Sequence, residues 1–150
     1  MINLYNQEDL LKRLDQLKAD ALPVFGVMGP QHMVEHLSYS TAMSTGRFPQ
    51  KLYFTEEQAG RFKKMLLEEE TFPMNFKAPM LGETPPPLSF NDLPAAIARL
   101  KKELDKFYSF FEENPGVTPV HPAMGAINRD EWIIFHNRHF THHFQQFRLI

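Results

Sequence analysis

The chain has 150 residues, of which 43% are hydrophobic and 23% charged, and its formal net charge is -2. These values favour one soluble globular domain over residues 1–150. The absence of any block of basic residues excludes nucleic acid as a main partner. Cysteine is also absent, which excludes disulfides and thiolate ligands, so a metal would have to be bound by His, Asp or Glu.

The N-terminal run MINLYNQEDLLKRL becomes polar and acidic within its first ten residues. It lacks the apolar stretch of a signal peptide. No run elsewhere approaches the ~20 apolar residues that a membrane span requires. We therefore expect a cytoplasmic protein that does not enter the membrane.

A first helix is expected to begin after Asn6. Asp9 follows three residues later, as in an N-terminal cap, and the apolar stripe comes next. This stripe consists of Leu10, Leu14 and Leu17. Prolines and glycines between residues 23 and 30 then predict a break in the helix.

A second helix is predicted over PQHMVEHLSYSTAMSTG. Pro30 suits its first turn, and Gly46 is expected to end it. Met33, Leu37 and Ser40 lie on one face, with His36 on the same side. This face is expected to pack against the core.

The middle of the chain combines a more polar helix with an irregular crossover. Thr55 and Gln58 form a possible capping box for a third helix that runs to about Glu69. Residues 71–90 are rich in proline, including three in succession, and are predicted to be a long non-helical crossover. The only plausible extended piece is KLYF at residues 51–54.

Two further helices are expected in the C-terminal half. Asn91 or Asp92 caps the fourth, whose apolar residues recur three and four apart. These are Ile97, Leu100, Leu104, Phe107 and Phe111. Residues 114–127 are predicted to be a loop, after which Asn128 with Glu131 caps the fifth helix. The fold class is therefore all-α: a four-helix bundle with the third helix and the crossover as additions.

His139 and His143 are the most informative residues in the sequence. They lie four residues apart in NRHFTHHFQQF, so on a helix both imidazoles face the same side one turn apart and could bind one ion. His36 is the best candidate for a third ligand. Three histidine ligands would leave coordination positions open, as in catalytic rather than structural metal sites.

The remaining histidines allow several interpretations. His136 lies on the same face of the last helix as His139, and is either a hydrogen-bonded core residue, a partner of a ligand or a wall of the pocket. His142 lies on the flank of that helix, and His32 is expected at the surface. His121 either lines the mouth of the site or stabilises a turn.

Two histidine-rich regions resemble those of the DinB-like superfamily of metal-dependent enzymes. The first is HMVEHL, and the second is the spaced pattern H-P-x-x-G, E-W and R-H-x-x-H-H-x-x-Q-F near the C-terminus. The chain is most similar to a branch of unknown function. The resemblance covers roughly residues 5–150.

This resemblance implies an up-down-down-up four-helix bundle that is often a homodimer. It also implies a site for one divalent metal ion (Zn, Ni, Fe or Mn) with His36, His139 and His143 as ligands. Its characterised members include thiol-dependent S-transferases and a mycothiol-dependent isomerase. The expected substrate is thus a small molecule or a low-molecular-weight thiol.

Two functional hypotheses follow from these observations. In the first, the protein is a metal-dependent hydrolase or thiol S-transferase, with Tyr39 as a possible hydrogen-bond donor and Gln146 as a further residue lining the site. Its catalytic residues are not identified by the sequence. In the second, the metal is structural or adventitious. The protein is then a dimeric binding module that uses the proline-rich crossover and the last loop as its surface.

Overall fold

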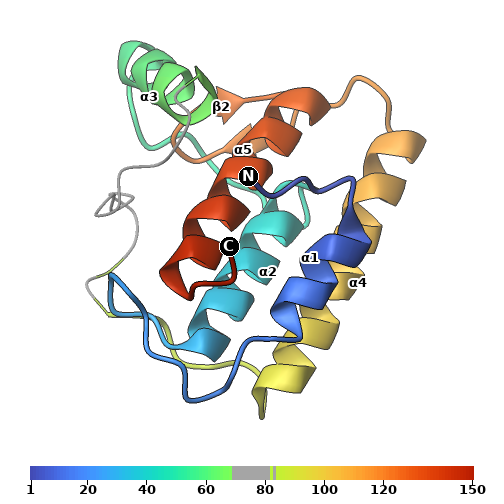
Figure 1. The fold of residues 1–150 in the computed structure, drawn as a ribbon. Coiled ribbons are helices and arrows are strands. Elements are labelled where there is room, and N and C mark those ends of the chain that lie inside the picture. Colours follow the sequence, from blue (N-terminus) through green and yellow to red (C-terminus); the bar gives the residue numbers. More distant parts are fainter. Residues whose placement is uncertain (69–81, 83) are drawn as a thin grey trace.

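Residues 1–68, 82 and 84–150 are described by the computed structural model, and this part of the chain forms five helices. Helix α2 packs mainly against α4 and also contacts α5, while α3 contacts α5 and lies at one end of the bundle, beside β2 (Figure 1). The bounds are α1 (Gln7–Leu14), α2 (Pro30–Met43), α3 (Glu56–Glu68), α4 (Leu93–Glu113) and α5 (Arg129–Gln146). The expected all-α bundle with an additional helix is confirmed.

Side chains at the helix N-termini satisfy backbone N–H groups that lack a partner within the helix. Asn6, Asp92 and Asn128 each accept a hydrogen bond from the backbone N–H three residues ahead, at 3.1, 2.8 and 3.0 Å. Glu131 accepts from the Asn128 N–H at 2.9 Å and completes the capping box of α5. The predicted box at Thr55 is also present. These local signals fix where the helices begin.

The predicted apolar stripes form the core. Leu10 and Leu14 of α1 are buried, and Leu17 is buried just beyond the end of that helix. On α4 the stripe is buried apart from Ile97, which is half-buried. Two clusters of buried side chains result: one joins α1, α2, α4 and α5, and the other lies around Trp132.

The N-terminal segment fixes the position of the last helix. The Ile2 N–H donates to Thr141 Oγ1 and the Leu4 N–H donates to Asn137 Oδ1, both at 2.8 Å. Tyr108 of α4 donates its hydroxyl to the Leu4 carbonyl at 2.6 Å. Figure 1 shows this segment running from the middle of α5 to α1. The helix that carries most of the histidines is thus tied to both α1 and α4.

A small hairpin replaces part of the expected last loop. Strands β1 (Val120–His121) and β2 (Gly125–Ala126) pair antiparallel. The expectation that residues 51–54 are the only extended piece was wrong, because they form no strand. Instead the Tyr53 N–H donates to the Pro122 carbonyl at 3.0 Å, so this segment lies beside the hairpin turn.

Most of the proline-rich crossover, together with the expected end of the third helix at Glu69, lies outside the described residues. Its last part is non-helical, as expected, and is held against α2. The Glu35 carboxylate accepts from the N–H groups of Ser89 and Phe90 at 2.7 and 3.1 Å. Within the described part of the chain, every helix is too short or too polar to cross a bilayer.

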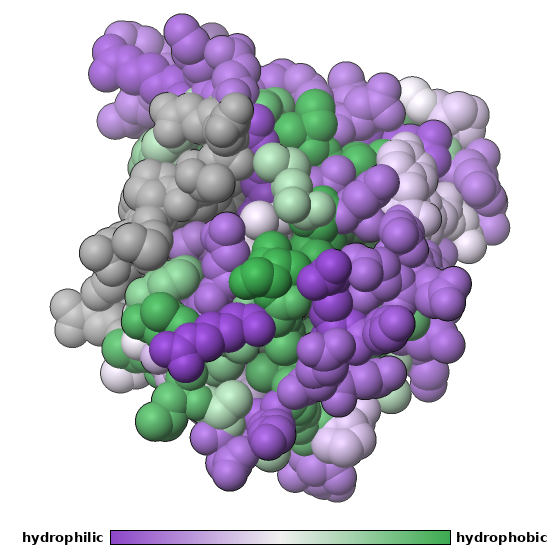
Figure 2. Space-filling model, viewed as in Figure 1, coloured by the Kyte–Doolittle hydropathy of each residue, from purple (hydrophilic) through white to green (hydrophobic). Residues whose placement is uncertain are grey.

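The segment between α1 and α2 exposes several aliphatic side chains. Leu22, Val24 and Val27 are 87%, 52% and 71% exposed. Apolar side chains appear at the lower left of Figure 2, where this segment lies in Figure 1. The segment leads directly into α2 and, as shown below, contacts the end of α5.

Candidate metal centre

His36 on α2 and His139 and His143 on α5 form a compact cluster of imidazoles. The ring centroids are 4.8 Å apart for His36–His139 and 4.9 Å apart for each of the other two pairs. The four-residue spacing on α5 stacks two rings on one face, and the contact between α2 and α5 brings the third ring to them. The three side chains that the sequence singled out are therefore adjacent in space.

The nitrogen atoms of this cluster are spaced suitably for one metal ion. One nitrogen from each residue lies within 4.8 Å of the other two, and His36 Nε2 and His139 Nε2 are 2.8 Å apart. Nitrogens bound to a common ion at about 2 Å are separated by roughly 3–4 Å. A shift of about 1 Å would thus give metal coordination, so the residues present fit a metal ion.

Burial keeps these imidazoles uncharged. His139 and His143 are 7% and 6% exposed, while His36 is half-buried, so the cluster lies just beneath the surface. Burial, with a smaller contribution from His142, lowers the pKa of His36 to about 4. Burial first, and then the neighbouring histidines, hold the pKa values of His139 and His143 well below the ordinary value. A neutral imidazole has the lone pair that a metal requires.

Gln146 connects the cluster to the segment before α2. Its Oε1 is 2.9 Å from His143 Nδ1, and its Nε2 donates to the Phe25 carbonyl at 2.7 Å. Its backbone carbonyl accepts from the Val24 N–H at 2.8 Å. Gln146, one of the further residues expected at the site, thus hydrogen-bonds to a member of the cluster.

His136 and His121 are bonded elsewhere. Ser44 donates its hydroxyl to the Thr41 carbonyl at 2.6 Å, so its oxygen accepts from His136 Nε2 at 3.1 Å. His121 Nδ1 accepts from the N–H groups two and three residues ahead, at 3.1 and 3.2 Å. Burial lowers the pKa of each to about 3, with a smaller contribution from His121 to that of His136. His136 is thus a core residue and His121 stabilises the hairpin turn.

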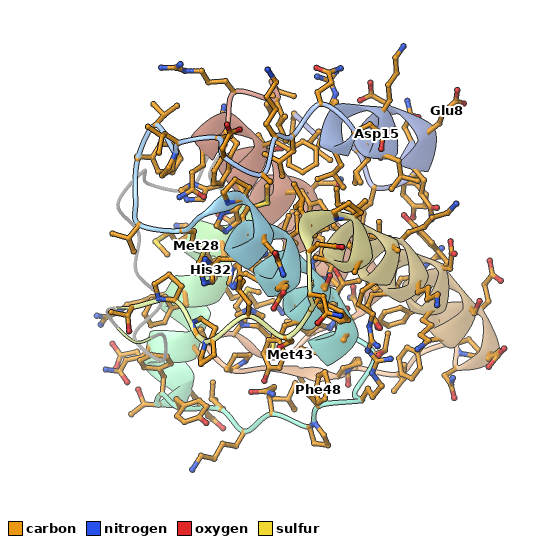
Figure 3. The ribbon with its side chains drawn as sticks, turned by 90° about the horizontal axis from the view of Figure 1, so that it is seen from below. Glu8, Asp15, Met28, His32, Met43 and Phe48 are labelled. Atoms are coloured by element: carbon orange, nitrogen blue, oxygen red, sulfur yellow. The ribbon has the colours of Figure 1, made fainter. Side chains whose placement is uncertain are left out.

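Tyr39, which was expected to line the site, and two further histidines of α2 and α5 lie outside the three-histidine group. Tyr39 is 52% exposed and stacks on Phe48, with ring centroids 5.2 Å apart. His142 lies on the flank of α5 and packs against Phe25 at 5.0 Å. His32 is half-buried near the start of α2 (Figure 3).

The contact between Gln146 and Phe25 was not predicted from the sequence. Gln146 follows His143 by three residues, so helical spacing already allows their side chains to meet. The Phe25 contact involves a backbone carbonyl, which every residue has. Its one sequence signal is Gly26, whose φ of 74° is the left-handed conformation that glycine adopts without strain.

No curated protein and no solved structure matches the chain. One family model, described as "Protein of unknown function (DUF1569)", matches residues 3–149. The match covers both helices of the histidine cluster and nearly the whole chain. The protein therefore belongs to the DUF1569 family, whose function is unknown.

Proposed function

We propose that the protein is a metal-dependent enzyme whose single divalent ion is bound by His36, His139 and His143. One observation carries this proposal: three neutral imidazoles from two helices, two buried and one half-buried, place their nitrogens within 4.8 Å of one another. Three uncharged rings without a carboxylate suit Zn, Ni, Fe or Mn better than Mg or Ca, which prefer oxygen ligands. The resemblance of both histidine regions to the DinB-like superfamily supports the same ligand set.

A catalytic role is favoured over a structural one by the number of ligands. Structural zinc sites are closed by four protein ligands, whereas catalytic sites keep at least one position for water or substrate. The two further buried histidines are engaged with Ser44 and with the hairpin turn. Only three histidines therefore converge in the described part of the chain, and the half-buried edge of His36 brings the centre close to solvent.

The reaction that we propose is hydrolysis or transfer of a low-molecular-weight thiol. A bound divalent ion lowers the pKa of a coordinated water or thiol and so supplies a nucleophile near neutral pH. The protein's own residues hold neutral nitrogens in place and exclude bulk water from two of the three rings. The substrate is proposed to be a small molecule, and the active form a homodimer.

The first experiment is elemental analysis by mass spectrometry of untagged protein purified without chelators or a nickel column. Wild type is expected to contain about one metal ion per chain. His139→Ala should contain almost none, while His142→Ala, the matched control on the flank of α5, should retain it. Equal loss in both variants, or no metal in wild type even after titration, would contradict the proposal.

A second experiment separates the two reaction classes. Cobalt-substituted protein would be titrated with a low-molecular-weight thiol and monitored by absorption spectroscopy. A thiolate-to-cobalt charge-transfer band, absent in His139→Ala, would support thiol transfer. Its absence would leave hydrolysis by coordinated water as the reaction to assay. If metal-free wild type were unfolded, the metal would be structural instead.

A further inference from the structure

The hydrogen bonds of Gln146 determine which ring nitrogen of His143 carries the proton. An amide nitrogen can only donate and an amide oxygen can only accept. Because Gln146 Nε2 donates to the Phe25 carbonyl at 2.7 Å, its Oε1 must face His143 Nδ1, 2.9 Å away. A hydrogen bond to that oxygen requires the proton of His143 to be on Nδ1. The lone pair is then on Nε2, the other ring nitrogen.

The segment before α2 holds Gln146 in this orientation. The Val24 N–H donates to the Gln146 carbonyl and the Phe25 carbonyl accepts from its side chain, so the contact has two points. Gln146 is 3% exposed, so water does not compete for its amide. A Cβ on Gly26 would lie 2.7 Å from Gln146 Nε2, so the close approach of this segment requires glycine. Even one added methyl group at Gly26 would therefore press on the Gln146 amide.

We infer that Gln146, held by the Phe25 carbonyl, is a positioning residue that fixes the proton of His143 on Nδ1 and directs its Nε2 lone pair to the metal centre. The inference rests on the proposed function, because it assigns Gln146 a role in binding the same ion. It also gives the exposed segment around Val24 and Phe25 a direct connection to one ligand. Partners of this kind commonly change metal affinity by about 10–100-fold.

Two substitutions distinguish this role from mere anchoring of the segment. Gln146→Leu removes both hydrogen bonds of the side chain. Gln146→Glu replaces the donor to Phe25 with a second acceptor oxygen, which must turn away from the Phe25 carbonyl, but it keeps an oxygen that can accept from His143 Nδ1. Gln145→Leu is the matched control, because Gln145 is the exposed neighbour on the same helix. Metal affinity would be measured by competition with a chelating indicator, and folding by circular dichroism.

We expect Gln146→Leu to bind metal about 10–100-fold more weakly than wild type. Gln146→Glu should stay close to wild type and Gln145→Leu should be unchanged. If both Gln146 variants lost metal affinity equally, Gln146 would only anchor the segment, and the inference would be overturned. Wild-type metal affinity in both variants would overturn it as well.

Nitrogen NMR of metal-free wild type tests the same inference without any substitution. The expected tautomer of His143 has its proton on Nδ1, and a proton on Nε2 would overturn the inference even if Gln146→Leu failed to fold. Wild type that binds no metal would instead remove the proposed function. The tautomer would still show whether Gln146 fixes His143, so the two failures are distinguishable.

Discussion

Helix α5 contributes histidines to two separate groups, whose ring nitrogens have different partners. In the metal-centre group, His139 and His143 direct nitrogens toward His36, with ring centroids 4.8–4.9 Å apart. In the second group, His136 Nε2 hydrogen-bonds to the Ser44 hydroxyl oxygen, and His121 Nδ1 accepts from a backbone N–H group of the hairpin turn. All five have lowered pKa values, mainly because they are buried.

This difference shows that burial and a low pKa do not identify a ligand. Both groups are neutral at physiological pH, so either could provide a lone pair. What differs is the partner of each nitrogen. His136 and His121 each direct a nitrogen to a separate partner, whereas His36, His139 and His143 bring one nitrogen each to a common point, as the ligands of one ion do.

The largest expected effect is the loss of metal from the first group only. His143→Ala should reduce metal content from about one ion per chain to nearly none, because two imidazoles bind an ion much more weakly than three. His136→Ala should retain the metal. Both variants would be assayed by elemental analysis after identical purification. Loss of metal from His136→Ala, in protein shown to be folded, would contradict the division into two groups.

The second group should instead determine stability. The His136 ring stacks on Trp132 with centroids 5.5 Å apart and an interplanar angle of 24°. His136→Ala should lower the free energy of unfolding by about 3 kcal/mol, as for other large buried rings. His136→Phe keeps the ring and should lose less than half of that amount, since Ser44 still donates to Thr41. Urea unfolding of metal-free protein would measure both, and equal losses would contradict the packing role.

The sequence predicts the first group better than the second for a physical reason. The spacing of His139 and His143 is a property of one helix, and the caps at Asn6 and Asn128 involve residues three apart. Such short-range features are readable from sequence.

The partners of the second group depend on how distant segments meet. His136 and Ser44 are 92 positions apart in the chain. Each strand of the hairpin around His121 is only two residues long, too short to show the alternation of apolar and polar residues by which a strand is recognised in a sequence. His36, the candidate third ligand, was predicted from its helical face and from the resemblance, but its proximity to His139 and His143 depends on the contact between α2 and α5.

A pH series tests the neutral state of the second group. The pKa of His136 falls from 6.5 to about 3 on folding, so the unfolded chain binds the extra proton as pH falls. Its contribution to stability is complete above pH 6.5 and is lost as pH falls toward 3. Between pH 6.5 and 5 this loss should be about 2 kcal/mol. His136→Phe should reduce the pH dependence of metal-free protein by that amount, measured by urea unfolding; an unchanged dependence would contradict a neutral, buried His136.

The smallest expected effect acts on the first group from a distance. Gly26 and Gly46 both have positive φ, of 74° and 67°. Alanine at either position should cost about 1 kcal/mol of stability, because a Cβ is strained in this conformation. Only at Gly26 would the Cβ also press on Gln146, at 2.7 Å, whereas nothing lies within 4 Å at Gly46.

Gly26→Ala should therefore weaken metal binding by about tenfold, through displacement of Gln146 from His143. Gly46→Ala should lose similar stability and keep the affinity of wild type, so it controls for backbone strain. Competition with a chelating indicator and urea unfolding would be measured on both variants. Equal metal affinities would mean that the segment before α2 does not act on the metal centre, since both variants carry the same strain and only one crowds the amide.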